Sequence, residues 1–220
     1  MGDTVTNHTS AHTFFCNFDR ISLSGSGDLI ITQGEQESLT VEADDNIMQY
    51  VRSDVSNRTL FLGFTPAARR KNIRPTVPIA FILSLKEVSG LELSGSGTVT
   101  AEKLTTDHLS IEISGFGRVH IGTFTAEGLV LRVSGSGDFE LAGKVVKQDV
   151  RMDGKANYRA GKLESETAAV EVRGWCDAAV WATDSLDVQI SGRGSVKYYG
   201  NPRVTQEISG SGSVRSLGNP

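Results

Sequence analysis

The string SGSG occurs four times in the chain, at 24–27, 94–97, 134–137 and 209–212. Related strings lie between these, and the first glycine of each turn falls at Gly95, Gly115, Gly135, Gly154, Gly174, Gly192 and Gly210. The successive spacings are 20, 20, 19, 20, 18 and 18 residues. A flexible Gly/Ser linker has no reason to keep such a period, whereas stacked structural repeats do. The string therefore marks the turn of a repeating unit.

The residues before each glycine alternate between apolar and polar types. Clear apolar-polar-apolar triplets begin at Leu91, Ile111, Leu131, Val150, Val170 and Val188, and a weaker one occupies 206–208. The alternation resumes after each turn, as at Val119 and Ile121. A period of two predicts a strand with one buried face. Each repeat is predicted to contain a strand, a GxG turn, a second strand and a second polar corner, such as 105–108 or 125–128.

A unit this short cannot bury its own apolar face, so neighbouring copies must stack at the strand spacing of about 4.8 Å. We therefore predict an all-β parallel solenoid with coils of 18–20 residues. Helices are disfavoured because each interior glycine costs a helix about 1 kcal/mol. A meander of antiparallel hairpins is the competing fold, and the near-constant period favours the solenoid.

The predicted corner glycines share the GxG position, where we expect backbone angles with positive φ. They are Gly25, Gly27, Gly95, Gly97, Gly115, Gly117, Gly135, Gly137, Gly154, Gly174, Gly192, Gly194, Gly210 and Gly212. The strings DGKA at 153–156 and RGWC at 173–176 lack the second glycine, so these two corners stand out as exceptions.

The polar middle residues of the triplets are predicted to form one column on a solvated outer face. In chain order they are Glu92, Glu112, Arg132, Arg151, Glu171, Gln189 and Glu207. Stacking predicts the pairs Glu112–Arg132 and Arg151–Glu171, each worth well under about 1 kcal/mol when exposed.

The N-terminal third departs from the repeat. We predict a tail over 1–17 and a single domain over 18–220, in which 18–90 form an irregular β-rich cap and 91–220 the regular repeats. Within the cap, a short helical turn is expected after Asp44 or Asp45. The segment 65–78 is predicted to be a basic loop punctuated by proline, and 79–85 a fully buried strand.

Composition limits the partners and the compartment. A net charge of −4 argues against a general binder of nucleic acid or anionic membrane. No run of 18 apolar residues occurs, so no membrane-spanning helix is expected, and the first residues lack the pattern of a signal peptide. Cys16 and Cys176 have no zinc spacing. Two free thiols are the first interpretation of these cysteines, and one long-range disulfide is the second.

From residue 18 to residue 217, the strings ISLSGSGDLIITQGEQESLTVEA and ISGRGSVKYYGNPRVTQEISGSGSVRSL resemble the putative auto-transporter adhesin head GIN domain family. The GSG turns and YYGNP carry the resemblance most specifically. It implies a right-handed β-helix similar to pectate-lyase-like solenoids, exported to the periplasm or surface of a Gram-negative cell. It also implies an adhesive role, and it brings no catalytic residues.

Sharper chemical hypotheses find little support. No phosphate-binding glycine loop occurs, and Asp28 and Asp138 are interpreted as turn aspartates rather than calcium ligands. His8, His12 and Cys16 recur every four residues, a metal-binding spacing only on a helix, and this stretch is expected to be extended. We predict no catalytic residue, cofactor or metal site.

Exposed aromatic rings are the candidate ligand contacts. Phe116 and Trp175 occupy the turn centre, which other repeats fill with serine or a basic residue, and Trp181 and Tyr199 lie at or near strand ends. The predicted function is non-enzymatic binding or adhesion in the cell envelope, with host or envelope glycans or proteins as partners and a homo-oligomer left open. One alternative is a carbohydrate-active enzyme that uses Glu92 and Glu112, and another is a periplasmic scaffold that contacts envelope proteins.

Overall fold

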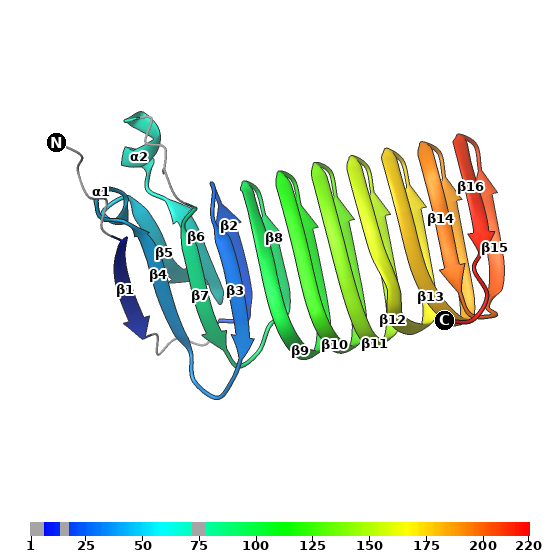
Figure 1. Cartoon of the computed structure of the whole chain (residues 1–220), viewed down its shortest axis with the longest axis horizontal. Coiled ribbons are helices and arrows are strands. Elements are labelled where there is room, and N and C mark those ends of the chain that lie inside the picture. Colours follow the sequence, from blue (N-terminus) through cyan, green and yellow to red (C-terminus); the bar gives the residue numbers. More distant parts are fainter. Residues whose placement is uncertain (1–6, 14–17, 72–77) are drawn as a thin grey trace.

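The computed structural model describes residues 7–13, 18–71 and 78–220. Its strands join in one 16-stranded sheet, which winds as a β-solenoid of about six turns. The coils stack along the long axis, with the N-terminal cap at one end and β15 and β16 at the other (Figure 1). The predicted all-β solenoid is confirmed.

Five long strands form the regular coils. They are β9 (Ser96–Ile113), β10 (Phe116–Val133), β11 (Ser136–Met152), β12 (Lys155–Val172) and β13 (Trp175–Ile190). Neighbouring coils pair in parallel and in register, so that Phe116 lies beside Ser96 and Ser136. The hydrogen-bonded ladder continues through 105–108 and 125–128. The predicted second corner is therefore a bend within a strand rather than a break between two strands.

The alternation of the sequence separates the interior from the surface. The apolar residues of the six clear triplets are buried, as are Val99, Val119, Phe139, Tyr158, Ala178 and Val196 after the turns. The polar residues between them face outward. Because equivalent residues of successive coils are register partners, the buried side chains form continuous columns between the two faces of the solenoid.

Close approach between coils explains the first glycine of each corner. The N–H of Trp175 donates to the carbonyl of Gly154 at 2.9 Å, and the same bond recurs at the other corners. A Cβ atom on Gly154 would lie 1.8 Å from the carbonyl oxygen of Gly135, which leaves no room for a side chain. Of the predicted turn glycines, Gly25 and Gly194 have positive φ, at 101° and 155°, and the prediction of positive φ is wrong for the others.

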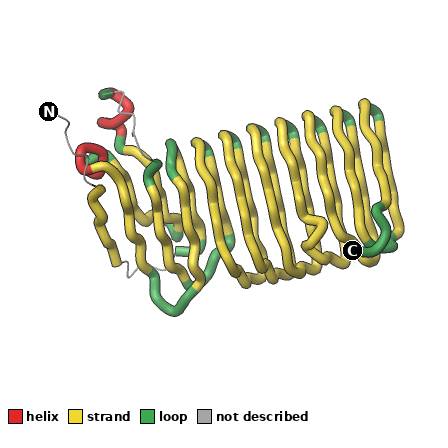
Figure 2. The backbone as a smooth tube through the Cα atoms, in the orientation of Figure 1, coloured by secondary structure: helices red, strands yellow, loops and turns green. Residues whose placement is uncertain are grey.

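The second corner position is constrained differently from corner to corner. At Gly97 and Gly194 a Cβ atom would lie 1.9 and 1.7 Å from a carbonyl oxygen of the preceding coil. At Gly117 and Gly137 the first atom that a Cβ would meet belongs to a side chain, at 2.6 and 2.5 Å, and side chains can shift. Ala156 and Cys176 occupy this position in the two exceptional corners and are buried there. The turns of successive corners lie in line along one edge of the stack (Figure 2).

The first coil is interleaved with distant chain segments. β2 (Arg20–Ser24) and β3 (Asp28–Gln33) pair in parallel with β8 (Gly90–Leu93) and with β9, although 70 residues separate Ser22 from its partner Glu92. On their other side the same strands pair in parallel with β6 (Thr59–Phe64) and β7 (Ala80–Leu85). The coil formed by β2 and β3 therefore lies between two coils that come later in the chain. One contains β6 and β7, and the other contains β8 and β9.

The outermost strands of the cap pair in antiparallel fashion. β4 (Ser38–Asp44) and β5 (Val51–Ser56) are antiparallel to β7 and β6, and β1 (Asn7–Thr13) is antiparallel to β4. β1 lies within the segment predicted as a tail. The boundary at residue 17 stays a prediction.

Three local predictions in the cap have different outcomes. The expected helical turn is α1 (Asp45–Met48), and Asp44 is its N-cap residue. The segment predicted as a loop contains α2 (Pro66–Arg70), with proline at the first helical position, and 72–77 lie outside the described residues. The prediction of a fully buried strand at 79–85 is wrong, because Ile82 of β7 faces solvent with 36% of its surface exposed.

The C-terminal coil consists of β14 (Arg193–Tyr199), β15 (Arg203–Ile208) and β16 (Ser211–Ser216). β15 pairs in parallel with β13, and β16 pairs in parallel with β14. Every residue of β15 is exposed, in keeping with the weak triplet at 206–208.

Candidate ligand-binding surface

The middle residues of successive corners form a ridge along one edge of the solenoid. We call this the corner ridge, and its members from β9 onward are Ser96, Phe116, Ser136, Lys155, Trp175, Arg193 and Ser211. Each N–H donates to a glycine carbonyl of the preceding coil, at 2.6–3.0 Å. The ridge therefore holds its side chains on a fixed backbone.

Two large rings project from this ridge. Phe116 is 69% exposed and Trp175 is 64% exposed. Phe116 borders a shallow hollow of about 430 Å³, which Arg118, Asp138 and Lys155 also line. Phe116 and Trp175 are three coils apart, roughly 14 Å at the usual strand spacing.

Trp175 lies between two cations of the ridge. Its register partners are Lys155 on one side and Arg193 on the other. The guanidinium carbon of Arg193 lies 5.2 Å from the centre of the Trp175 ring, within the range of a cation–π interaction. One face of the indole is therefore covered by a cation, and the side chain remains largely exposed.

Trp181 and Tyr199 form a separate pair, away from the ridge. They are register partners on β13 and β14, and both are half-buried. Tyr199 packs against Gly161, where a Cβ atom would lie 2.7 Å from the tyrosine ring, and Trp181 lies over Gly200. The four predicted aromatic contacts thus occupy two places, the ridge and the outer face of β13–β14.

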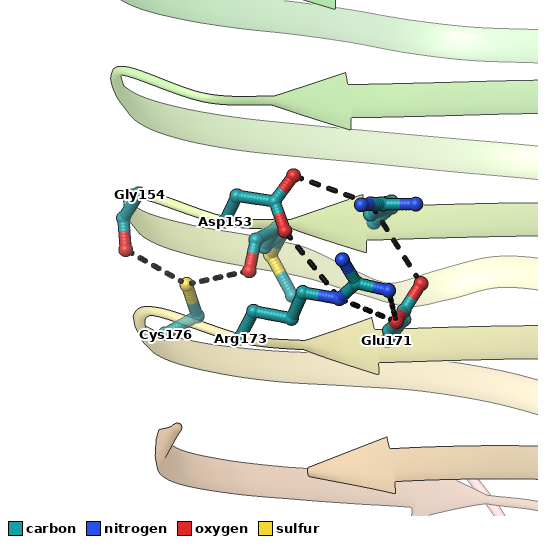
Figure 3. Close-up of polar contacts among 7 residues, drawn as sticks. Asp153, Gly154, Glu171, Arg173 and Cys176 are labelled. Atoms are coloured by element: carbon teal, nitrogen blue, oxygen red, sulfur yellow. Dashed lines mark hydrogen bonds and ion pairs between the residues drawn. The ribbon is translucent and has the colours of Figure 1, made fainter. Parts of the chain in front are cut away.

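A ring of ion pairs lies where the chain enters the two exceptional corners, at 151–153 and 171–173 (Figure 3). Asp153 contacts Arg151 at 3.2 Å and Arg173 at 3.7 Å, while Glu171 contacts Arg173 at 2.5 Å and Arg151 at 3.7 Å. Each charge of the ring thus has two opposite neighbours. The ring also contains the predicted pair Arg151–Glu171, which is confirmed.

Cys176 lies beneath the same corner. Its Sγ donates to the carbonyl oxygens of Gly154, at 3.5 Å, and Met152, at 3.8 Å (Figure 3). Burial raises the pKa of the Cys176 thiol, which favours its protonated form. The thiol is free, and Cys16 lies outside the described residues.

The carboxylates of the enzymatic alternative are neighbours in the outer column. Glu92 and Glu112 are register partners, both are exposed, and Ser22 donates to Glu92 at 3.1 Å. They border an open hollow of about 420 Å³ together with Arg132. Glu112 and Arg132 are adjacent in register, but no ion pair joins them, so that predicted pair is wrong.

The turn aspartates bind the neighbouring coil. Asp28 Oδ1 accepts the N–H of Thr98 at 2.9 Å, and Asp177 Oδ1 accepts both the N–H and the hydroxyl of Ser195. Asp138 accepts from Asn157 at 3.4 Å. These contacts support the interpretation of turn aspartates.

Metal-binding side chains do not gather anywhere in residues 18–71 and 78–220, where no three of the His, Cys, Asp and Glu residues could hold an ion together. His8 and His12 lie on β1, a strand rather than a helix. Their spacing therefore does not form a helical metal-binding face.

Fold and surface together define a β-solenoid repeat protein that displays side chains from a rigid outer face. Residues 17–202 match the family described as "Putative auto-transporter adhesin, head GIN domain". The chain belongs to this family, as the resemblance of its turns and of YYGNP predicted.

Solved structures share the fold along almost the whole chain. A putative adhesin from Bacteroides fragilis NCTC 9343 is 28% identical with a TM-score of 0.90, and the match covers 96% of this chain and 97% of that one. A putative lipid binding protein from Parabacteroides distasonis ATCC 8503 is 24% identical with a TM-score of 0.73, covering 96% of both chains. A putative adhesin from Parabacteroides merdae ATCC 43184 is 20% identical with a TM-score of 0.72, again covering 96% of both.

The last two likenesses establish the fold alone. No protein of curated function matches the chain. Neither described helix has the length and hydropathy that crossing a membrane requires.

Proposed function

We propose that the chain is a non-enzymatic protein of the cell envelope, periplasmic or surface-exposed, that binds glycans through the corner ridge. The observation that carries the proposal is the exposure of Phe116 and Trp175 on a backbone fixed by inter-coil hydrogen bonds. The family, named for adhesins, supports the same role.

Binding would be passive. An aromatic ring offers the apolar C–H face of a sugar a large contact area at low conformational cost, because the ring is already positioned. Polar side chains beside it, such as Ser136 and Arg118, can satisfy the sugar hydroxyls. A polymer that lies along the ridge meets both rings.

A glycan array tests the proposal. Wild-type protein is expected to bind a subset of the array, and Trp175→Ala or Phe116→Ala is expected to weaken that binding by about tenfold, as loss of an aromatic anchor does. Val146→Ala is the matched control, because Val146 is an exposed apolar residue away from the ridge. If the wild type binds no glycan, the proposal fails and the scaffold alternative becomes the better interpretation.

A reducing-sugar assay on the same glycans tests the non-enzymatic part. Release of sugar would contradict it. Loss of that release in Glu112→Gln would then assign the reaction to the Glu92–Glu112 pair, whereas binding without release supports a passive role.

A further inference from the structure

One outer face of the C-terminal coils carries an unusual set of side chains. This face is formed by the outward residues that begin with the corner ridge and continue along β12, β13, β14 and β16. These positions hold five cations and three aromatic rings. We call this set the basic–aromatic face: Lys155, Arg159, Trp175, Trp181, Arg193, Lys197, Tyr199 and Arg215. Two carboxylates lie among these positions, Asp177 and Glu164, and Glu164 is the register partner of Trp181. In a chain of net charge −4, this is a local concentration of positive charge.

Most of these cations have no carboxylate partner. Arg159 contacts Asp138 of the preceding coil at 2.8 Å, and Arg193 lies over Trp175. Within the described part of the chain, Lys155, Lys197 and Arg215 form no ion pair and are exposed. Surface cations without partners are available to an external anion.

The charge changes sign along the same side of the sheet. The equivalent outward positions of β9 to β11 hold two cations, Arg118 and Lys144, and three carboxylates, Glu102, Asp138 and Glu140. Lys144 forms an ion pair with Glu164 at 2.9 Å. The excess of positive charge is therefore confined to the C-terminal coils.

The cations and rings occupy neighbouring positions of the sheet. Lys197 lies beside Arg215 in the next coil, at about 4.8 Å between strands, and Tyr199 follows two positions further along, at about 6.6 Å. Trp181 and Tyr199 pack against Gly161 and Gly200, so their rings form part of the floor instead of projecting from it.

We propose that the basic–aromatic face binds an acidic polysaccharide, a chain of sugars that carries carboxylate or sulfate groups. The inference rests on the proposed glycan-binding function and names the ligand class. Arginine and lysine form charge-assisted hydrogen bonds with such anions, and the rings accept the apolar faces of the sugars between them. Asp177 accepts hydroxyl groups through oxygen lone pairs that Ser195 leaves free.

Other polyanions fit this face less well. A nucleic acid carries a charge at every residue and stacks its bases on open rings, but Asp177 interrupts the positive surface and Arg193 covers one face of Trp175. An anionic membrane requires apolar side chains that insert, whereas Trp181 and Tyr199 are half-buried in the floor. A glycan with charges spaced between neutral hydroxyls matches the mixture of cations, rings and hydrogen-bonding groups.

The test compares probes and variants of the full 220-residue chain by biolayer interferometry. The probes are alginate and chondroitin sulfate as acidic glycans, dextran as a neutral one, a single-stranded oligonucleotide, and phosphatidylglycerol vesicles. The test variant is Arg193→Gln/Lys197→Gln/Arg215→Gln. The matched control is Lys86→Gln/Lys103→Gln/Lys147→Gln, which removes the same number of exposed cations from elsewhere.

The wild type is expected to bind at least one acidic glycan about tenfold or more tightly than dextran, with weakening as salt rises. The triple variant is expected to lose about tenfold of that affinity, and the control to stay within about twofold. The single variants Lys197→Gln and Arg215→Gln, at exposed side chains without ion pairs, give the same direction of change if the triple variant fails to fold.

Each contrary result has a distinct meaning. If dextran binds as tightly as the acidic glycans, the ligand class is wrong. If the triple variant binds unchanged, the basic–aromatic face is not the binding site. In both cases the proposed glycan-binding function stands. Tighter binding of the oligonucleotide or the vesicles overturns the inference in favour of that partner. If no glycan of either charge binds, both the inference and the proposed function fail.

Discussion

Asp19 connects chain segments on both sides of the first coil. Its carboxylate accepts hydrogen bonds from Arg58 at 3.2 Å and from the Ser89 hydroxyl at 2.8 Å, and its carbonyl accepts from Ser89 and Gly90. Arg58 lies in the turn between β5 and β6, and Ser89 directly precedes β8. One residue therefore links three segments that the interleaved topology brings together.

The carboxyl group of Asp19 should make stability depend on pH. Burial alone would raise its pKa, but the hydrogen bonds from Arg58 and Ser89 and the charge of Arg58 outweigh burial and lower the pKa of Asp19. Since the unfolded value is about 3.9, the stabilisation is complete above about pH 4 and is lost as the pH falls through the folded value. Asp19→Asn is expected to lower the free energy of unfolding by about 1 kcal/mol at neutral pH and by less in acid.

Urea unfolding of the wild type and of Asp19→Asn, at neutral and acid pH, measures this difference. Asp187→Asn, at an exposed carboxylate without an ion pair, is the control. A difference from the wild type that stays constant across the pH range would contradict the assigned cause.

Tyr158 and Gln148 form a polar contact across the apolar interior. The Tyr158 hydroxyl donates to Gln148 Oε1 at 2.7 Å, and Gln148 Nε2 donates to the Leu163 carbonyl at 3.2 Å. Both side chains are fully buried, and burial raises the pKa of Tyr158, so the hydroxyl stays a donor. Tyr158→Phe leaves the Gln148 oxygen without a partner and is expected to cost about 1–3 kcal/mol in urea unfolding. A cost near zero would show that the bond contributes nothing net.

At the scale of the element, the first and second positions of the corner at 153–156 should differ in their response to substitution. Gly154→Ala places a methyl group 1.8 Å from a backbone oxygen and is expected to cost about 3 kcal/mol or more, because the coils must move apart. Ala156→Gly, two residues further along the same corner, removes a buried methyl group and is expected to cost about 1 kcal/mol. Equal costs in thermal unfolding would contradict the close-approach explanation.

The repeat in the sequence made most of the regular coils predictable. The repeat predicted the coils, their register and the buried columns, because every coil restates the same pattern. The positive φ expected at Gly154 was wrong because one chain does not reveal that the neighbouring coil's carbonyl lies over the glycine. α2 was missed because a helix of five residues is decided by its surroundings more than by its propensity.

The candidate surface was partly predictable. Phe116 and Trp175 were visible as departures from serine at a fixed position, and their exposure follows from the corner. The basic–aromatic face was not, because its cations come from different strands. The pairing of β12 with β13 also contains a register shift between Ala160 and Glu164, which the sequence repeat does not predict.

At the scale of the molecule, the two ends of the solenoid differ. The first coil lies between parallel neighbours, and Leu23 is buried with partners on both β6 and β8. At the other end, Gln206 and Ser216 stand in register with the inward positions of Val188 and Tyr198. The inward apolar residues Val204 and Ile208 of β15 are 37% and 40% exposed. The inward positions of the last coil are therefore partly exposed to solvent, whereas those of the regular coils are buried.

This asymmetry predicts unequal responses to damage. In a stack of coils, stability is approximately a sum of coil and interface contributions, so removal of residues 201–220 eliminates one terminal interface. The shortened chain is expected to unfold cooperatively with a loss of about 1–2 kcal/mol, each 1 kcal/mol lowering Tm by about 2–4 °C at this size. Leu23→Ala, a single change between two neighbouring coils, is expected to cost about 2–5 kcal/mol. Calorimetry of both variants measures the two losses, and a truncation more damaging than Leu23→Ala would show that the C-terminal coil, rather than the interleaved first coil, holds the stack together.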